Sequence, residues 1–328
     1  MGLNRAGTAL AAFAEEVGGP ESGPVAVVGG RTQWGAGRLD GPANDVREVH
    51  APVGVVELEP AEMTVRVEAG TTVADLDAGL APSGQTVALP DWPGATVGGV
   101  LAVGRSGVRR LGWGPVRDTL LEARVVSAEG RLVKAGGPTV KNVSGYDLCR
   151  LLVGSLGTLG LLAEVVLRTR PQPELSQWYR SAALQPGGER LRPQDDPFAV
   201  LAAVHRPNAV LHDGAHTWVL LEGHGVDVAA EATVLSDLGF APCDRRDRPD
   251  LLAFSHHLSV DPAALPALVA DLEPGSFVAE VGVGVVHTHG PYPSCVLDPV
   301  VVELNRRVKA AFDPTGRLNP GCDPLRAR

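Results

Sequence analysis

Residues 136–160 read GGPTVKNVSGYDLCRLLVGSLGTLG, and the interpretation of the whole chain depends on this stretch. It surrounds one short apolar run with glycines and with the polar residues Lys141, Tyr146 and Asp147. Glycine lets the backbone turn sharply and approach a ligand closely. The stretch is therefore either a series of tight turns or one wall of a ligand site, and two earlier glycine-rich segments bear on that choice.

The first of these segments, VGGRTQWGAG (residues 28–37), overlaps the end of a strand-like run, PVAVVGG (24–30). Glycines after a strand allow backbone N–H groups to turn inward and hold an anion. The second segment, GATVGGVLAVGRSG (94–107), combines glycine with small residues, so a flat or phosphorylated ligand can approach it. The third, GSLGTLG (154–160), closes the opening stretch, although its glycine period also suits a helix packed closely on a strand.

Any one of the three segments is explained by turns, but three of them interleaved with β-structure favour a ligand site. The first segment is not a Rossmann fingerprint, because no helix with G-x-G-x-x-G spacing follows it. It is not a phosphate loop of the Walker type either, since it lacks the Gly-Lys-Ser/Thr sequence.

Composition narrows the class of protein. A length of 328 residues suggests two domains, and a net charge of -9 argues against nucleic acid as a partner. No apolar stretch reaches the length of a membrane span, so we predict no transmembrane segment. The four cysteines (Cys149, Cys243, Cys295 and Cys322) are scattered without a CxxC pair. This pattern disfavours a metal site, an iron–sulfur cluster and a disulfide framework, and it predicts a cytoplasmic protein.

Periodicity predicts many short strands and few helices. In the first half we expect strands at 24–30, 54–60, 63–70 and 160–173, a hairpin over 120–136, a helix over 71–84 and a loop-rich stretch over 89–118. In the second half we expect strands at 199–206, 216–224, 251–259 and 276–290, and helices at 226–240, 262–272 and 301–312. Two β–α–β-like halves of this kind predict a ferredoxin-like second domain.

Together, the three glycine segments and the tail FDPTGRLNPG (312–321) resemble the FAD-binding domain of the vanillyl-alcohol oxidase and p-cresol methylhydroxylase family. The resemblance implies an α+β fold. It places a two-subdomain FAD-binding domain of p-cresol methylhydroxylase type at residues 1–172 and a small, reduced ferredoxin-like α+β cap domain at 173–299. A C-terminal helix and tail at 300–328 would return to the FAD domain.

The resemblance also implies which residues contact FAD. They are Gly29, Gly30, Arg31, Thr32, Gln33 and Trp34 around the pyrophosphate, Pro93, Thr96, Val97, Gly98, Gly99, Ser106 and Gly107 along the cofactor, Gly157, Gly160, Leu161, Glu164 and Val165 beside the adenosine and the flavin, and Asn319 in the tail. Covalent attachment in the family uses a histidine beside the first loop, and this chain has none there, so we expect noncovalent FAD. Arg105 departs from the small residue that relatives usually have beside the flavin ring.

Within this family the stretch 140–160 looks like the FAD-binding subunit that accompanies the catalytic subunit of glycolate oxidase. That likeness implies a small 2-hydroxy acid (glycolate or D-lactate) as substrate, and a hetero-oligomer with a second flavoprotein subunit and an iron–sulfur subunit that receives the electrons. It is also compatible with a peripheral position at the inner face of the membrane through those partners. Two alternatives stay open: a self-sufficient FAD-dependent oxidase of another alcohol, and a non-catalytic scaffold subunit with a degenerate flavin site.

Oxidation of a 2-hydroxy acid needs a base for the hydroxyl proton and a cation for the carboxylate. We predict His287, at the end of the last strand of the second domain, as the base, because histidine titrates near neutral pH. Arg110 is the predicted carboxylate partner, and Tyr146 is a third candidate in the opening stretch. For each residue a packing or surface role is the alternative. We expect His287 and His289 to point to opposite sides, so that only one of them faces a given pocket unless the strand bulges.

Overall fold

Two compact units share the chain in the computed structural model, which describes residues 2–38, 45–137, 147–182, 196–290 and 298–326. Unit 1 comprises Met1–Gly107, Pro115–Gln172 and Val296–Arg328, and unit 2 comprises Val108–Gly114 and Pro173–Cys295. The short segment 108–114, which no sequence pattern set apart, thus belongs to unit 2. No helix in the described residues is both long enough and apolar enough to cross a membrane.

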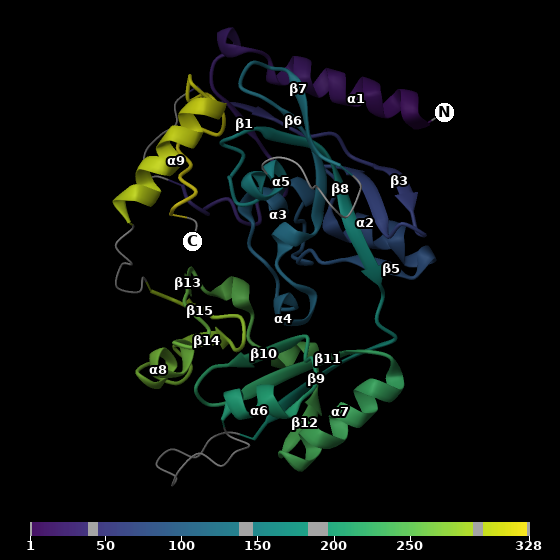
Figure 1. The fold of residues 1–328 in the computed structure, drawn as a ribbon, viewed down its shortest axis with the longest axis vertical. Coiled ribbons are helices and arrows are strands. Elements are labelled where there is room, and N and C mark those ends of the chain that lie inside the picture. Colours follow the sequence, from purple (N-terminus) through teal and green to yellow (C-terminus); the bar gives the residue numbers. More distant parts are fainter. Residues whose placement is uncertain (1, 39–44, 138–146, 183–195, 291–297, 327–328) are drawn as a thin grey trace. The chain divides into compact units, whose positions relative to one another are not determined.

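Unit 1 is built around an antiparallel sheet (Figure 1). Its elements are α1 Gly2–Val17, β1 Val25–Val27, β2 Arg47–Val49, β3 Val55–Glu59, β4 Thr64–Glu68, α2 Val73–Leu80, β5 Gln85–Val87, α3 Val97–Val103, β6 Leu120–Val126, β7 Leu132–Gly136, α5 Leu148–Leu152, β8 Leu161–Pro171 and α9 Pro299–Phe312, with 3-10 turns at Pro20–Ser22, Ala81–Ser83 and Val116–Asp118. The strand order is β3-β4-β8-β6-β7, and β5 pairs separately with β8. Strands β1 and β2 form a small parallel pair.

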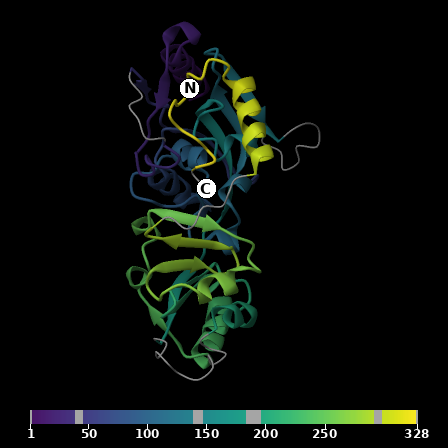
Figure 2. The same cartoon turned by 90° about the vertical axis from the view of Figure 1, so that its left-hand side faces the viewer.

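Alternating side chains give this sheet a core on each side. Val65 and Val67 of β4 pack with α2, α3 and α5 in the larger core, whereas Arg66 between them points to the other face. The smaller core lies under α1, whose Leu10 and Phe13 pack with residues of β1, β6 and β8. Figure 2 shows α9 and the tail that follows it, in yellow, lying against unit 1.

The helix expected over 71–84 is confirmed by α2. It was predictable because its cap and its apolar spacing are both local signals. Thr72 Oγ1 accepts a hydrogen bond from Asp75 N (3.0 Å), and Gly84 takes a left-handed φ of 63° shortly after the last buried leucine of the helix, Leu80. The expected loop over 89–118 is wrong in part, since it contains α3, capped by Thr96 and ended by Gly104 (φ 71°). The residues of GSLGTLG form turns rather than a helix.

Unit 2 begins with the β–α–β–β–α–β order of a ferredoxin-like fold. Its elements are α4 Arg110–Trp113, β9 Leu175–Ser181, α6 Pro197–Ala203, β10 Ala209–His212, β11 Thr217–Gly223, α7 Gly225–Asp237, β12 Phe240–Cys243, β13 His256–Ser259, α8 Leu265–Ala270, β14 Phe277–Glu280 and β15 Val285–Thr288, with 3-10 turns at Arg245–Asp247 and Leu251–Ala253. Strands β9 to β12 lie in the order β12-β9-β11-β10, and β14, β15 and β13 extend the same antiparallel sheet to seven strands, part of which is visible in Figure 2.

Two sequence predictions in unit 2 are wrong. A strand is expected at 199–206, but Pro197–Ala203 form helix α6, which Asp196 caps through its side chain (2.9 Å to Phe198 N). The expected strand 276–290 is a hairpin, because the backbone turns at Gly282 and Gly284, both with positive φ, and β15 then pairs with β14.

Candidate cofactor site

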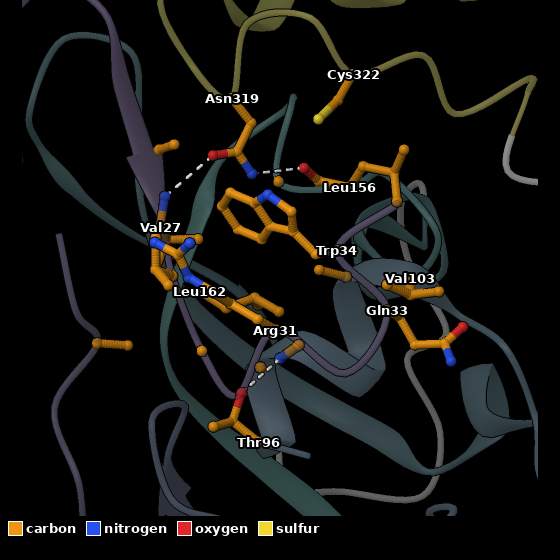
Figure 3. Close-up of a pocket in the computed structure, with 18 of the residues that line it drawn as sticks. Val27, Arg31, Gln33, Trp34, Thr96, Val103, Leu156, Leu162, Asn319 and Cys322 are labelled. Carbon is orange, nitrogen blue, oxygen red and sulfur yellow. Dashed lines mark hydrogen bonds between the residues drawn. The ribbon is translucent and has the colours of Figure 1, made fainter. Parts of the chain in front are cut away.

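A cavity of about 420 Å³ opens in unit 1 and is lined by residues of all three glycine segments and of the tail (Figure 3). Its volume is typical of a site for an organic ligand. Main-chain groups of glycines form much of the wall, and every lining residue belongs to unit 1. The three segments and the tail, which are far apart in the sequence, therefore enclose one space.

The first and second glycine segments meet through their backbones. A Cβ placed on Gly30 would lie 1.7 Å from the carbonyl oxygen of Gly94, and one on Gly29 would lie 2.3 Å from Thr96 Oγ1. Neither position accepts a side chain without displacing its neighbour. The glycines at 29 and 30 are thus needed for packing of the first loop against the start of α3.

Helix α3 contributes Gly98, Gly99, Val100, Ala102 and Val103 to the cavity lining. Its first turn is closed by Thr96 Oγ1, which accepts a hydrogen bond from Gly99 N (3.2 Å; Figure 3). A Cβ on Gly98 would lie 2.9 Å from the carbonyl oxygen of Ala69, so this glycine lets α3 lie close to the end of β4. Small residues therefore keep the α3 side of the cavity open.

Two arginines bring positive charge to the cavity lining. The guanidinium groups of Arg31 and Arg38 lie 4.8 Å and 3.9 Å from the centre of the Trp34 ring, and all three residues line the cavity. Arg31 also forms an ion pair with Glu48 (2.6 Å), another lining residue. Such a lining suits a ligand that combines an aromatic ring with an anionic group.

The tail closes the cavity through Asn319, Pro320 and Cys322. Asn319 Oδ1 accepts a hydrogen bond from Val27 N (3.0 Å), and its Nδ2 donates one to the carbonyl oxygen of Leu156 (2.6 Å). Burial raises the pKa of the half-buried Cys322 thiol. Burial also raises the pKa of Cys149, which lies in the core, to about 11. Both thiols are therefore protonated and poorly nucleophilic at neutral pH.

The structure brings most of the sequence-predicted cofactor residues together in this lining. They are Gly29, Gly30, Arg31, Thr32, Gln33, Trp34, Thr96, Gly98, Gly99, Gly157, Gly160 and Asn319. Arg105, singled out as a departure from the family, lies beside the cavity, with its guanidinium group 5.9 Å from the Trp92 ring centre and 3.4 Å from Gln33 Oε1.

The other predicted cofactor residues lie outside the lining. Val97, Leu161 and Val165 are core residues, and Pro93 is exposed. Ser106 Oγ accepts a hydrogen bond from Val116 N (3.1 Å), and Gly107 packs on Pro90. Glu164 is buried in an ion pair with Arg66 (3.0 Å).

Several lining residues were not among the predicted cofactor contacts, although Leu156 lies in the third glycine segment and Leu162 just after it. They include Arg38, Glu48, Trp92, Leu156, Leu162 and Cys322. Arg38 directly follows the first glycine segment, so its closeness to that segment was the available signal. Leu156 has a φ of 53°, and a left-handed backbone cannot be predicted from a leucine, which rarely adopts it.

The residues predicted for chemistry lie apart from this cavity lining or outside the described residues. His287 is buried on β15, and its Nε2 lies 2.7 Å from Oε1 of the buried Glu280. His289 stacks on Phe254 (4.4 Å between ring centres), and the His287 ring lies 6.4 Å from the same Phe254 ring. The expectation that the two histidines face opposite ways is therefore wrong, because residues two apart along a strand point to the same face. Arg110 begins α4 of unit 2. Tyr146 falls outside the described residues, and among those that are described no cluster of His, Cys, Asp or Glu is placed to hold a metal ion.

Two family models match the chain: the FAD binding domain over residues 15–136 and the C-terminal domain of FAD linked oxidases over residues 267–322. The first match contains the first and second glycine segments, and the second contains Asn319. The cavity that these segments enclose, with its glycine backbone and its two arginines, fits a dinucleotide with an anionic centre.

Similar proteins of known name include subunits and enzymes that act on 2-hydroxy acids. The chain is 34% identical over 220 residues to glycolate oxidase subunit GlcE of Escherichia coli (strain K12), which is 65% of this chain and 59% of that protein. It is 43% identical over 107 residues to the D-lactate dehydrogenase of Archaeoglobus fulgidus, 32% of this chain and 24% of that one. The chain thus spans less than two thirds of these relatives' lengths.

The fold has a solved counterpart in alkyldihydroxyacetonephosphate synthase, with a TM-score of 0.65 at 15% identity. That likeness covers 94% of this chain and 74% of the synthase, and at such low identity it concerns the fold alone. The fold, the cavity and the two family matches agree with one another. The chain carries the FAD binding domain and the C-terminal domain of FAD linked oxidases over the matched residues, and FAD is its cofactor.

Proposed function

We propose that this chain is the FAD-binding subunit of a complex that oxidises a 2-hydroxy acid, glycolate or D-lactate, and that passes the electrons to a partner subunit. The observation that carries the proposal is the cavity of unit 1, enclosed by segments that fall within the two matched family domains. The similarity over 220 residues to a glycolate oxidase subunit supports the substrate class.

In this proposal the glycine backbone of residues 29–30 and 98–99 lies against the cofactor, and Arg31 and Arg38 face its phosphates. FAD, when bound, accepts the hydride from the carbon that carries the substrate hydroxyl. Attachment is noncovalent, because the Cys322 thiol beside the cavity is kept protonated by burial, which raises its pKa.

The proposed chemical groups are His287, Tyr146 and Arg110. His287 would take the hydroxyl proton, with Glu280 holding its ring in place through the 2.7 Å contact. Arg110 would meet the substrate carboxylate. A His287→Gln variant that keeps its melting temperature and its flavin but loses turnover would support the role of base; a variant that only loses stability would indicate packing.

The proposed partners are a second flavoprotein subunit and an iron–sulfur subunit, in the cytoplasm or at the inner face of the membrane. The name of the relative, a subunit of glycolate oxidase, supports assembly with other chains. The scattered cysteines of this chain support placing an iron–sulfur cluster elsewhere in the complex.

An absorbance spectrum of the purified chain, recorded without oxygen before and after addition of glycolate or D-lactate, tests the proposal. We expect flavin bands that stay oxidised in the isolated chain and bleach when the partner subunits are added. Bleaching by the isolated chain would indicate a self-sufficient oxidase. A chain that shows no flavin bands even after incubation with FAD would overturn the proposal in favour of a scaffold subunit.

A further inference from the structure

The side chain of Asn319 joins two walls of the cavity. One end of its amide accepts a hydrogen bond from Val27 N on β1 (3.0 Å), and the other donates to the carbonyl oxygen of Leu156 (2.6 Å), as Figure 3 shows. A backbone N–H can only donate and a carbonyl can only accept, so these partners fix the orientation of the amide. Val27 and Leu156 both line the cavity, and the single amide of Asn319 bonds to both of them.

The backbone around this bridge is held in an unusual conformation. Asn319 and Leu156 have φ values of 42° and 53°, and Arg31 in the first loop has 55°. Asparagine tolerates the left-handed region, but a leucine or an arginine there is strained by roughly 1–3 kcal/mol and persists only where its surroundings hold it. The three residues line one cavity. The strained Leu156 is the residue whose carbonyl oxygen accepts the hydrogen bond from Asn319.

Hydrogen bonds on both sides of Asn319 hold the tail in place. Asp313 accepts hydrogen bonds from Arg317 N (3.1 Å) and Leu318 N (2.8 Å), which close the turn before Asn319. Asn319 N in turn donates to Val25 O (2.8 Å) on β1. The amide therefore has little freedom to follow a displaced wall, and it resists separation of β1 from the turn at Leu156.

We infer that Asn319 is a positioning residue for the cofactor: it sets the distance between the β1 wall and the Leu156 wall, so FAD affinity depends on its amide although both ends of that amide are engaged within the protein. This inference rests on the proposed FAD site. It assigns to Asn319 an action through Val27 and Leu156 in place of direct recognition of the cofactor.

The test measures FAD dissociation by fluorescence in the full chain. Asn319→Ala removes two hydrogen bonds from the walls, and we expect FAD to bind about tenfold to a hundredfold more weakly. Asn305→Ala is the matched control, because Asn305 Nδ2 also donates to a carbonyl oxygen (Val301, 2.9 Å) but lies on α9 and does not line the cavity. The control should bind FAD as the natural chain does.

Asn319→Asp separates positioning from a general loss of structure. A neutral carboxylic acid can accept from Val27 N and donate to Leu156 O, whereas a carboxylate would face the Leu156 oxygen as a second acceptor. FAD affinity of this variant should therefore recover as the pH falls through the carboxyl range, about pH 4 to 6, while the natural chain stays flat. This pH profile also carries the test should Asn319→Ala fail to fold.

The outcomes are distinct. If the natural chain binds no FAD, the proposed function falls and this inference falls with it. If the natural chain binds FAD and both Asn319 variants bind it equally well at all pH values, only the inference is overturned. Weakened binding in Asn319→Asp that does not recover in acid would also overturn it, since that result would assign Asn319 a role other than bridging the two walls.

Discussion

Individual glycines of the first loop differ sharply in what they permit. A Cβ on Gly30 would lie 1.7 Å from the Gly94 oxygen, whereas one on Gly35, in the same loop, would meet nothing within 4 Å. We therefore expect Gly30→Ala to displace the loop and to weaken FAD binding more than about tenfold. Gly35→Ala should leave it unchanged. Equal affinities for the two variants, measured by flavin fluorescence, would contradict the packing described for this loop.

Charge also acts at single positions, most clearly at Glu68. Its side chain is buried, it lies opposite Glu164 across β4 and β8, and burial followed by the Glu164 charge raises its pKa. A raised pKa in the folded state means that the neutral carboxyl stabilises the fold at low pH. This contribution is complete below the unfolded pKa and is lost as the pH rises through the folded pKa.

Glu68→Gln should therefore be more stable than the natural chain at pH 7, by ~1 kcal/mol, and the advantage should vanish below about pH 4. Urea unfolding at both pH values measures the difference. Glu62→Gln, an exposed position in the turn before β4, is the control and should show no such trend. A Glu68→Gln variant that is less stable at pH 7 would show that the Glu68 carboxylate is stabilised by its surroundings.

At the scale of elements, the sequence predicts what local signals specify. Helix α2 was predictable because its threonine cap and its apolar spacing lie within one short run. Helix α3 was missed because Gly98 and Gly99 indicate a loop. Its threonine cap, Thr96, and its terminating glycine, Gly104, were overlooked, and its apolar side chains pack in the core. The strand expected at 199–206 was wrong because a short apolar run fits a helix equally well. The preceding Asp196–Pro197 pair was the overlooked signal for a helix start.

The cavity was predictable only in part for the same reason. Glycine clusters mark the loops that come close to a ligand, so residues 29–34 and 98–99 could be named from the sequence. Glu48 on β2 reaches the lining by tertiary contact and lies outside every glycine segment, so no local pattern predicts it. The burial of His287 against Glu280 depends on the turn between β14 and β15. The sequence predicts one continuous strand there, so this contact could not be predicted.

One contact between elements is strong enough to test alone. The buried guanidinium of Arg317 donates to the carbonyl oxygens of Val17 (2.7 Å), Gly18 (3.1 Å), Gly23 (2.9 Å) and Ala128 (3.2 Å), and so joins the tail to the end of α1. Arg317→Met would leave buried acceptors without donors. We expect a loss of about 2–4 kcal/mol of unfolding free energy in urea. Arg326→Met, an exposed arginine of the same tail, should cost little.

For the whole molecule, the two units should respond differently to the cofactor. Each residue lining the cavity belongs to unit 1. Free FAD at about 100 times its dissociation constant should stabilise that unit by about 2.7 kcal/mol. Hydrogen exchange should then slow in β1, α3 and the turn at 154–157. Equal protection of β9 to β12, in unit 2, would contradict an FAD site confined to unit 1, and removal of FAD should reverse the effect.

The bridge from Val27 to Asn319 spans 292 residues of sequence and so has a consequence for protein synthesis. At translation rates of about 5–20 residues per second, the first loop leaves the ribosome roughly 15–60 s before the asparagine that braces it. Unit 2 is made in that interval. Nascent chains arrested before residue 319 should accordingly capture little flavin, and loading with cofactor becomes a late event that reports on completion of unit 1.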